Sequence, residues 1–242
     1  MIVFLHGVPE TAAIWDKVRA AIAPRESIAL SLPGFGCARP AGFSATKDAY
    51  VDWVLAELDR LGEPVDLVGH DWGAGITYGI ATRHGDRIRS WAADVAAVVH
   101  PDYVWHDFAQ IWQTPGAGEE FVANQASTPV ADRAPLFEAL GVPHDDAMAM
   151  AGEWDETMGL AILDLYRSAT PNPHADWGPW SKTAAPGLIL HPTADPFDDR
   201  ARAEEMAAVF GASFAAFEAS HFWPYEAPEA AAAALMGFWD SL

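Results

Sequence analysis

The sequence is poor in cysteine and in positive charge, and it contains no long hydrophobic run. Its one cysteine, Cys37, cannot form a disulfide within the chain, which suits a cytosolic protein. Lys and Arg number 14 against 34 Asp and Glu, and the resulting net charge of -20 argues against nucleic acid or an anionic membrane as a partner. No apolar run approaches the roughly 20 residues of a membrane span, and the first residues do not resemble a signal peptide. We therefore expect a soluble, cytoplasmic protein.

The composition is that of a globular protein with a sizeable core. Hydrophobic residues make up 51% and charged residues 20% of the 242 residues. Since cores divide only beyond roughly 250 to 300 residues, we expect one domain with a small insertion. The sequence does not indicate an oligomeric state.

Short apolar segments alternate with amphipathic helical patterns over most of the chain. This alternation predicts an α/β protein with a mostly parallel sheet flanked by helices on both faces. The predicted strands are Ile2–Leu5, Ser27–Ser31, Val65–Gly69, Ile88–Val95, Gly187–His191 and Ser213–Phe217. The predicted helices include Ala13–Ala23, Thr46–Leu61, Ala201–Phe210 and Pro228–Trp239.

The segment 100–182 breaks this alternation. It contains helical patterns, no convincing strand, and prolines at positions 115, 129, 135, 143, 171, 173 and 179. A helical insertion between two strands of one sheet predicts a lid, or cap, over the carboxyl edge where open α/β sheets bind ligands. We therefore assign residues 1–99 and 183–242 to the core domain and 100–182 to the cap.

Residues 69–73, Gly-His-Asp-Trp-Gly, follow the third predicted strand and lead into a helical pattern. A strand, a short turn with a glycine at each end and a helix are typical of a nucleophile elbow. Such a turn makes its middle side chain project above the sheet, and here that side chain is Asp71. A carboxylate nucleophile implies a chemistry different from that of the more usual serine hydroxyl.

The turn His6–Glu10 directly follows the first predicted strand. In folds with a nucleophile elbow, this turn and the residue after the nucleophile each supply a backbone N–H to an oxyanion hole. The candidate donors are therefore the N–H groups of Val8 and Trp72. They would stabilise charge that develops only as an ester intermediate breaks down.

A candidate base and two candidate acids lie farther along the chain. His221 follows the last predicted strand and is the only histidine after Asp195. Asp195 lies just past the fifth predicted strand, and Asp94 lies at the end of the fourth. The order nucleophile, acid, base matches that of elbow-containing hydrolases. Asp195 is the preferred acid, and Asp94 stays open as the alternative.

These motifs are spread over nearly the whole chain, and together they resemble the epoxide hydrolase and haloalkane dehalogenase branch of the α/β-hydrolase superfamily. The matching segments are His6–Glu10, Leu32–Gly36, Gly69–Gly73, and His221 and Phe222 with Glu226, Pro228 and Glu229. The resemblance implies an α/β-hydrolase fold with an inserted helical cap. Family members usually have two strands before the His-Gly turn, whereas this sequence begins on the strand that leads into that turn. We therefore expect a sheet narrower by two strands.

The resemblance also implies a mechanism. Asp71 attacks an sp³ carbon and forms an alkyl-enzyme ester, and His221, oriented by an acid, activates the water that hydrolyses the ester. Histidine is not needed to activate a nucleophile that is already ionised. The implied partners are a small apolar organic substrate and water.

The residues of the predicted lid help to distinguish an epoxide from a halide as the reacting group of the substrate. Epoxide hydrolases use two lid tyrosines that donate hydrogen bonds to the oxirane oxygen. The segment 107–116 resembles the one that carries the first tyrosine, with Trp112 in place of a phenylalanine and Phe108, which cannot donate, in place of that tyrosine. The second tyrosine is usually followed by arginine, as Tyr166 is here. We therefore expect Tyr166 to be the one hydroxyl donor.

A dehalogenase instead needs donors for a departing halide. Trp72 is correctly placed, but many epoxide hydrolases also have tryptophan there. The asparagine or glutamate that often completes the halide site is replaced by Val8. Trp105, Trp112 or Tyr166 could substitute. The arginines that fluoroacetate dehalogenases carry just after the nucleophile are absent.

The leading hypothesis is an epoxide hydrolase-like enzyme that opens a small apolar epoxide to a diol. A haloalkane dehalogenase is the second hypothesis, and a ligand-binding protein without catalysis is the third. We expect no cofactor and no metal. Asp145, Asp146, Asp198 and Asp199 are typical of helix starts or loops, and His100, His106, His144 and His174 do not have a metal-ligand spacing.

Overall fold

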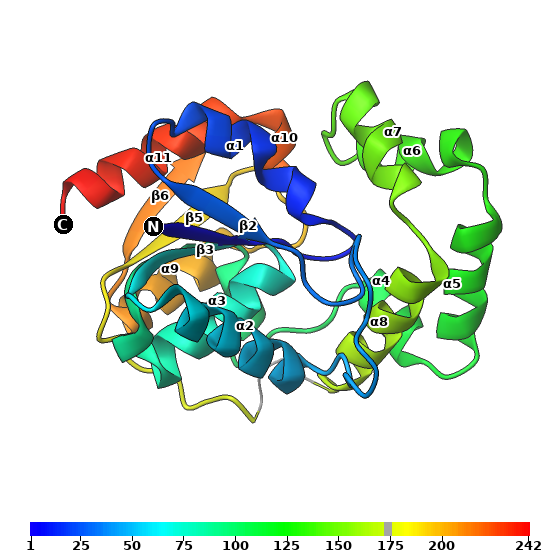
Figure 1. Cartoon of the computed structure of the whole chain (residues 1–242), viewed down its shortest axis with the longest axis horizontal. Coiled ribbons are helices and arrows are strands. Elements are labelled where there is room, and N and C mark those ends of the chain that lie inside the picture. Colours follow the sequence, from blue (N-terminus) through cyan, green and yellow to red (C-terminus); the bar gives the residue numbers. More distant parts are fainter. Residues whose placement is uncertain (172–175) are drawn as a thin grey trace.

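The computed structural model describes residues 1–171 and 176–242. In these residues the strands form one parallel sheet in the order β2-β1-β3-β4-β5-β6 (Figure 1). The strands are β1 (Ile2–Leu5), β2 (Ser27–Leu30), β3 (Val65–Gly69), β4 (Ile88–Ala93), β5 (Gly187–Pro192) and β6 (Ser213–Phe217). The predicted mostly parallel α/β fold is confirmed, and every predicted strand is present within two residues of its expected ends.

Helices cover both faces of this sheet (Figure 1). On one face lie α1 (Asp16–Ala21), α10 (Trp223–Glu226) and α11 (Pro228–Asp240), and on the other lie α2 (Lys47–Leu61), α3 (Trp72–Arg83) and α9 (Arg200–Phe210). The short 3-10 helices are η1 (Ala12–Trp15), η2 (Gly85–Arg87) and η3 (Ala96–Val99). The helix predicted at 13–23 is therefore divided into η1, capped by the Thr11 side chain, and α1. No helix of the described residues is both long and apolar enough to cross a membrane.

The core consists of two apolar layers, one on each side of the sheet. Residues of β1 and β3 are buried throughout, as expected for central strands of a parallel sheet, whereas β6 at the edge is partly exposed. Tyr78 stacks on Phe210 in one layer at a ring distance of 5.3 Å. Phe4 packs on Trp15 in the other at 4.7 Å. These layers hold the strand ends, and hence the site residues, in fixed positions.

The segment between β4 and β5 forms the helices α4 (Asp107–Gln113), α5 (Ala117–Ser127), α6 (Val130–Glu138), α7 (His144–Gly152) and α8 (Glu156–Arg167). No strand occurs there among the residues described. Pro129 and Pro143 directly precede α6 and α7, where the fixed φ of proline suits a helix start, and Pro135 lies within α6. These helices lie to one side of the sheet (Figure 1), and the cap bounds stay a prediction. Pro173 and His174 lie outside the described residues.

Candidate active site

The turn between β3 and α3 holds Asp71 in a strained backbone conformation, with φ 52° and ψ -118°. The flanking glycines make this turn possible. A Cβ at Gly69 would lie 2.2 Å from the carbonyl oxygen of Gly73, and one at Gly73 would lie 2.2 Å from that of Leu5. The predicted nucleophile elbow is therefore present in shape, with the aspartate at its apex.

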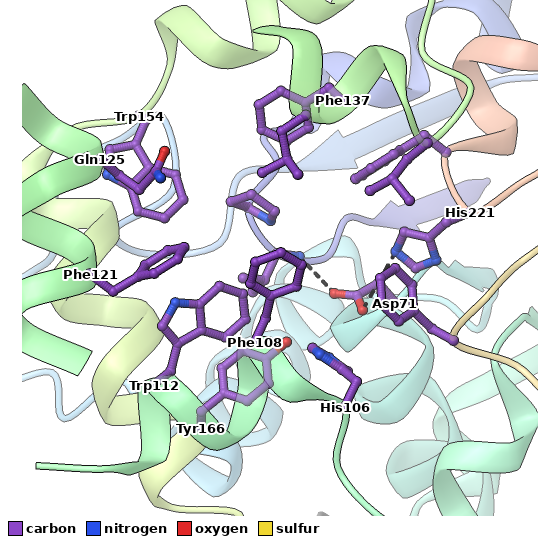
Figure 2. Close-up of a pocket in the computed structure, with 16 residues that line it drawn as sticks. Asp71, His106, Phe108, Trp112, Phe121, Gln125, Phe137, Trp154, Tyr166 and His221 are labelled. Carbon is purple, nitrogen blue, oxygen red and sulfur yellow. Dashed lines mark hydrogen bonds and ion pairs between the residues drawn. The ribbon is translucent and has the colours of Figure 1, made fainter. Parts of the chain in front are cut away.

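The turn after β1 reaches this apex with a backbone donor. The N–H of Val8 donates to Oδ1 of Asp71 at 2.7 Å (Figure 2), and the backbone N–H of Trp72 also hydrogen-bonds to this carboxylate. Both predicted oxyanion donors thus contact Asp71. One carboxylate oxygen, Oδ1, is thus held by the Val8 N–H.

His221 lies on the other side of Asp71, in the loop after β6. Its Nε2 is 3.9 Å from Oδ2 of Asp71, too far for a hydrogen bond but close to the carbon that an ester at Asp71 would present. Its Nδ1 is 2.9 Å from Oδ2 of Asp195, which follows β5. The other oxygen of Asp195 accepts the N–H of Phe197 at 2.8 Å. Asp195 therefore orients His221 in this structure.

The alternative acid, Asp94, has other partners. Its Oδ2 lies 2.5 Å from Nδ1 of His70 and accepts the indole N–H of Trp223 at 2.6 Å. Its Oδ1 accepts the N–H of Asp71 at 3.0 Å. Asp94 thus hydrogen-bonds to the backbone of the elbow and not to the ring of His221.

Burial and charge set the titration of these groups. Burial raises the pKa of Asp71 to about 6, although the charge of His221 opposes this. Burial alone would lower the pKa of His221, but the charge and the hydrogen bond of Asp195 raise it overall. The pKa of Asp195 is lowered, because His221 and the Phe197 N–H outweigh the effect of burial. The resulting arrangement has an ionised acid beside a base of raised pKa.

A pocket opens above Asp71 (Figure 2). Its wall is mostly aromatic, and Asp71 and His221 lie at one end. The segment between β4 and β5 supplies most of the rings, namely His106, Phe108, Trp112, Phe121, Phe137, Trp154 and Tyr166. Such an apolar wall with a few polar groups at one end is typical of a site for a small organic molecule.

Tyr166, Phe108 and Trp112, the predicted lid residues, all line this pocket. The hydroxyl of Tyr166 hydrogen-bonds to the side chain of Trp72, whose indole nitrogen can only donate. The Tyr166 oxygen is therefore the acceptor, and its own proton is free to donate into the pocket. Burial, and the nearby charge of Asp71, raise its pKa well above the usual value, so it stays protonated.

His106, which has no metal-ligand spacing in the sequence, also lines the pocket. It precedes α4, and its Nδ1 accepts the backbone N–H of Ala109 at 3.3 Å. Its ring points toward Asp71 (Figure 2), and burial together with the charge of His221 lowers its pKa to about 4. A neutral ring that accepts at Nδ1 carries its proton on Nε2. The sequence signal that could have identified this residue is its position just before a helical pattern, because a histidine there can act as the helix cap.

Glu10, His70 and His221 bring ligand-type atoms within 4.8 Å of one another. His70 lies between two carboxylates, with Nε2 3.0 Å from Glu10 Oε1 and Nδ1 facing Asp94. Burial would lower the pKa of His70, but these two charges raise it well above the usual value. A cation would have to displace the proton that holds this array together. The metal-free mechanism stays a prediction.

Among known proteins, a model described as "Alpha/beta hydrolase family" matches residues 2–234. A haloalkane dehalogenase of Mesorhizobium japonicum is 28% identical over 185 residues, which cover 72% of this chain and 54% of that protein. Epoxide hydrolase 2 of Siraitia grosvenorii is 35% identical over 94 residues, covering 37% and 30% of the two chains. The matched region thus spans about half or less of these relatives.

Solved structures agree with this fold. A mutant of an epoxide hydrolase from Bacillus megaterium superposes with a TM-score of 0.81 at 21% identity, covering 99% of this chain and 93% of that one. A haloalkane dehalogenase from Bradyrhizobium elkani gives 0.72 at 20% identity, covering 100% and 91%. At these identities the likeness concerns the fold alone. Because the family model matches nearly the whole length, the chain belongs to the alpha/beta hydrolase family.

Proposed function

We propose that this protein hydrolyses epoxides through an alkyl-enzyme ester at Asp71. The observation that carries the proposal is a pair of uncharged donors beside that carboxylate. The side chains of Tyr166 and His106 line the same end of the pocket as Asp71 (Figure 2), and each carries one proton that it can donate, on the hydroxyl of Tyr166 and on Nε2 of His106. An opening epoxide develops an alkoxide that both donors can stabilise. His106 thus supplies the second donor that Phe108 cannot provide.

The proposed first step forms the ester. Oδ2 of Asp71 attacks one oxirane carbon while Oδ1 stays bound to the Val8 N–H. The carbon–oxygen bond of the ring breaks, and the alkoxide takes its proton from Tyr166 as His106 donates a hydrogen bond. The product is an ester between Asp71 and the substrate carbon.

The second step uses His221. Its neutral Nε2 removes a proton from water, and the hydroxide attacks Cγ of Asp71. The resulting oxyanion is stabilised by the N–H groups of Val8 and Trp72. Collapse releases the diol and regenerates the carboxylate, and the proton on His221 returns to Tyr166 through solvent. Asp195 stabilises the imidazolium between these events.

Halide departure, the second hypothesis, is less well supported by the same pocket. The indole of Trp72 is hydrogen-bonded to Tyr166, and the indole nitrogen of Trp112 lies on the side of its ring away from Asp71 (Figure 2). The relatives named above include both kinds of enzyme and do not choose between them. Hydroxyl and imidazole donors suit a strongly basic alkoxide better than a weakly basic halide.

The test is product analysis with a panel of aliphatic and styrene-type epoxides and matched haloalkanes. We expect diol from epoxides, and we expect Asp71→Asn to abolish it. Halide release without diol formation from any epoxide would overturn the proposal in favour of a dehalogenase.

Intact-protein mass spectrometry separates either enzyme from a binding protein without catalysis. We expect His221→Gln to accumulate a covalent adduct on Asp71, since the ester forms but is not hydrolysed. A protein that only binds its ligand would give no adduct with any epoxide or haloalkane. Asp71→Asn is the matched control, because it removes the nucleophile with little change in shape.

A further inference from the structure

The far end of the pocket contains polar groups that the reaction at Asp71 does not use. The indole nitrogens of Trp112 and Trp154 are buried, and neither has a hydrogen-bond partner among the described residues. Both side chains line the pocket, with 6% and 8% of their surfaces exposed. An unpaired buried donor costs free energy, so two of them in one pocket wall call for an explanation.

A row of ring contacts leads from the reacting end through Trp112 to Trp154. Tyr166 contacts Trp112 at 4.7 Å, Trp112 contacts Phe121 at 5.8 Å, and Phe121 contacts Trp154 at 6.5 Å. Tyr166 lies beside Asp71, so Trp154 is three ring contacts from the reacting end. The edge contacts with Phe121 are weaker partners for an N–H than an oxygen is. The row therefore ends in donors that can still take an acceptor.

A third polar group lies at this end. The side chain of Gln125 lines the pocket one helical turn after Phe121 on α5, and in Figure 2 it lies toward the same end of the pocket as Phe121 and Trp154. Its carboxamide has two donor hydrogens. Two indoles and a carboxamide on an otherwise apolar wall match an oxygen atom carried by an apolar chain.

The charge around this end favours an uncharged group. Among the described residues the pocket wall includes no Lys or Arg. Arg133, a buried cation outside that wall, donates its Nη1 to the backbone carbonyl oxygen of Gln125. The net charge of -20 further opposes the entry of an anion.

We propose that the pocket recognises an uncharged oxygen acceptor, such as an ester carbonyl, on the substrate chain, through Trp112, Trp154 and Gln125. This inference depends on the proposed function in one respect only, namely that the reacting group of the substrate is an epoxide. It assigns to the substrate an apolar chain with an epoxide at one end and an oxygen acceptor at the other. A plain alkyl epoxide would fill the pocket but leave its buried donors unpaired.

Calorimetry with unreactive ligands tests this subsite independently of turnover. The probes are a series of methyl esters of ω-hydroxyalkanoic acids, the n-alkanols with equal numbers of heavy atoms, and the corresponding free acids. At the best chain length we expect the ester to bind roughly tenfold more tightly than the alkanol, as one hydrogen bond to a buried donor allows. Equal affinities, or tightest binding of the free acid, would overturn the proposal.

Point variants identify the residues that cause the preference for the ester over the alkanol. Trp154→Phe and Trp112→Phe keep a ring but remove the N–H, and we expect each to reduce the ratio of ester to alkanol affinity toward one. Trp53→Phe, on the half-buried face of α2 outside the pocket, is the control and should keep the full ratio. A ratio unchanged in both pocket variants would contradict the assignment. An ester preference without turnover of any epoxide would refute only the proposed function.

Discussion

Oδ2 of Asp94 lies 2.5 Å from Nδ1 of His70, and this contact commits Asp94 to the residue just before the proposed nucleophile. On the opposite side of the same ring, Nε2 of His70 is 3.0 Å from Glu10. The pair therefore ties the turn after β1, the elbow and the end of β4 into one buried array. Asp195 is left as the partner of His221.

Replacing each of the two candidate acids, Asp195 and Asp94, should have a different effect on ester hydrolysis and on stability. We expect Asp195→Asn to slow ester hydrolysis by roughly ten-thousand-fold, as in serine triads, because an amide favours the wrong tautomer of the histidine. The alkyl-enzyme should then accumulate in mass spectra. Asp94→Asn should lower stability without trapping the ester, because the Asp195–His221 contact is kept. The reverse pattern would make Asp94 the acid.

His106 and Tyr166 should each affect the first step. We expect Tyr166→Phe, and likewise His106→Asn, to lower the rate of ester formation by about 100- to 1000-fold, the usual loss for one oxyanion donor. Asparagine can still cap α4, so the melting temperature of His106→Asn should stay close to that of the wild type. Rapid-mixing kinetics of adduct formation in the His221→Gln background measure the effect. An unchanged rate in His106→Asn would remove this residue from the mechanism.

Acid should stop ester formation as Asp71 becomes protonated. The pKa of Asp71 is raised to about 6, so its nucleophilic form is lost as pH falls through that value, about tenfold for each further unit. His106, with a pKa near 4, stays neutral over this range and should add no step. Single-turnover rates of adduct formation between roughly pH 4.5 and 8, a range that brackets the pKa of Asp71 and stays above that of His106, would show the acid limb.

Ester hydrolysis should need a higher pH than ester formation. His221 acts as a base only when neutral, and its pKa is raised above the usual value, so hydrolysis is lost as pH falls through that raised pKa. We therefore expect the alkyl-enzyme to accumulate in mildly acidic solution. Quenched samples analysed by mass spectrometry would show this, and adduct levels independent of pH would contradict it.

Gly7 should be intolerant of any side chain. A Cβ there would lie 2.3 Å from both Cβ and Oδ1 of Asp71, so Gly7→Ala must displace the carboxylate. A displacement of about 1 Å can cost roughly 100-fold in rate, and we expect at least that loss in kcat/KM. Gly237→Ala in α11 is the control, since nothing lies within 4 Å of its added Cβ. It should raise the free energy of unfolding by about 0.5–1 kcal/mol and leave activity unchanged.

Much of the fold followed from the sequence because its signals are local. Apolar runs of four to six residues between helical patterns specify buried parallel strands, and the glycines of the elbow specify a turn that few other residues permit. Parallel strands end at one edge of a sheet, so residues just after β1, β3, β5 and β6 had to meet there. Val8, Asp71, Asp195 and His221 are in such positions.

Other features could not be deduced from local patterns. Asp94 and Asp195 both end neighbouring strands, and only side-chain packing decides which of them reaches His221. The role of His106 depends on which ring nitrogen caps α4, and hence on which one faces the pocket. The role of Trp72 also depends on the tertiary structure, because its indole hydrogen-bonds to Tyr166, a residue far away in the sequence.

The sequence by itself determined the parallel sheet, the elbow with aspartate at its apex and the helical nature of the inserted segment. Backbone turns and hydrophobic periodicity encode these features within a few residues of each position. Only the tertiary structure decided the partner of His221, the donors that face Asp71 and the polar far end of the pocket. Those depend on the direction in which side chains from distant segments point, and that direction is set by packing.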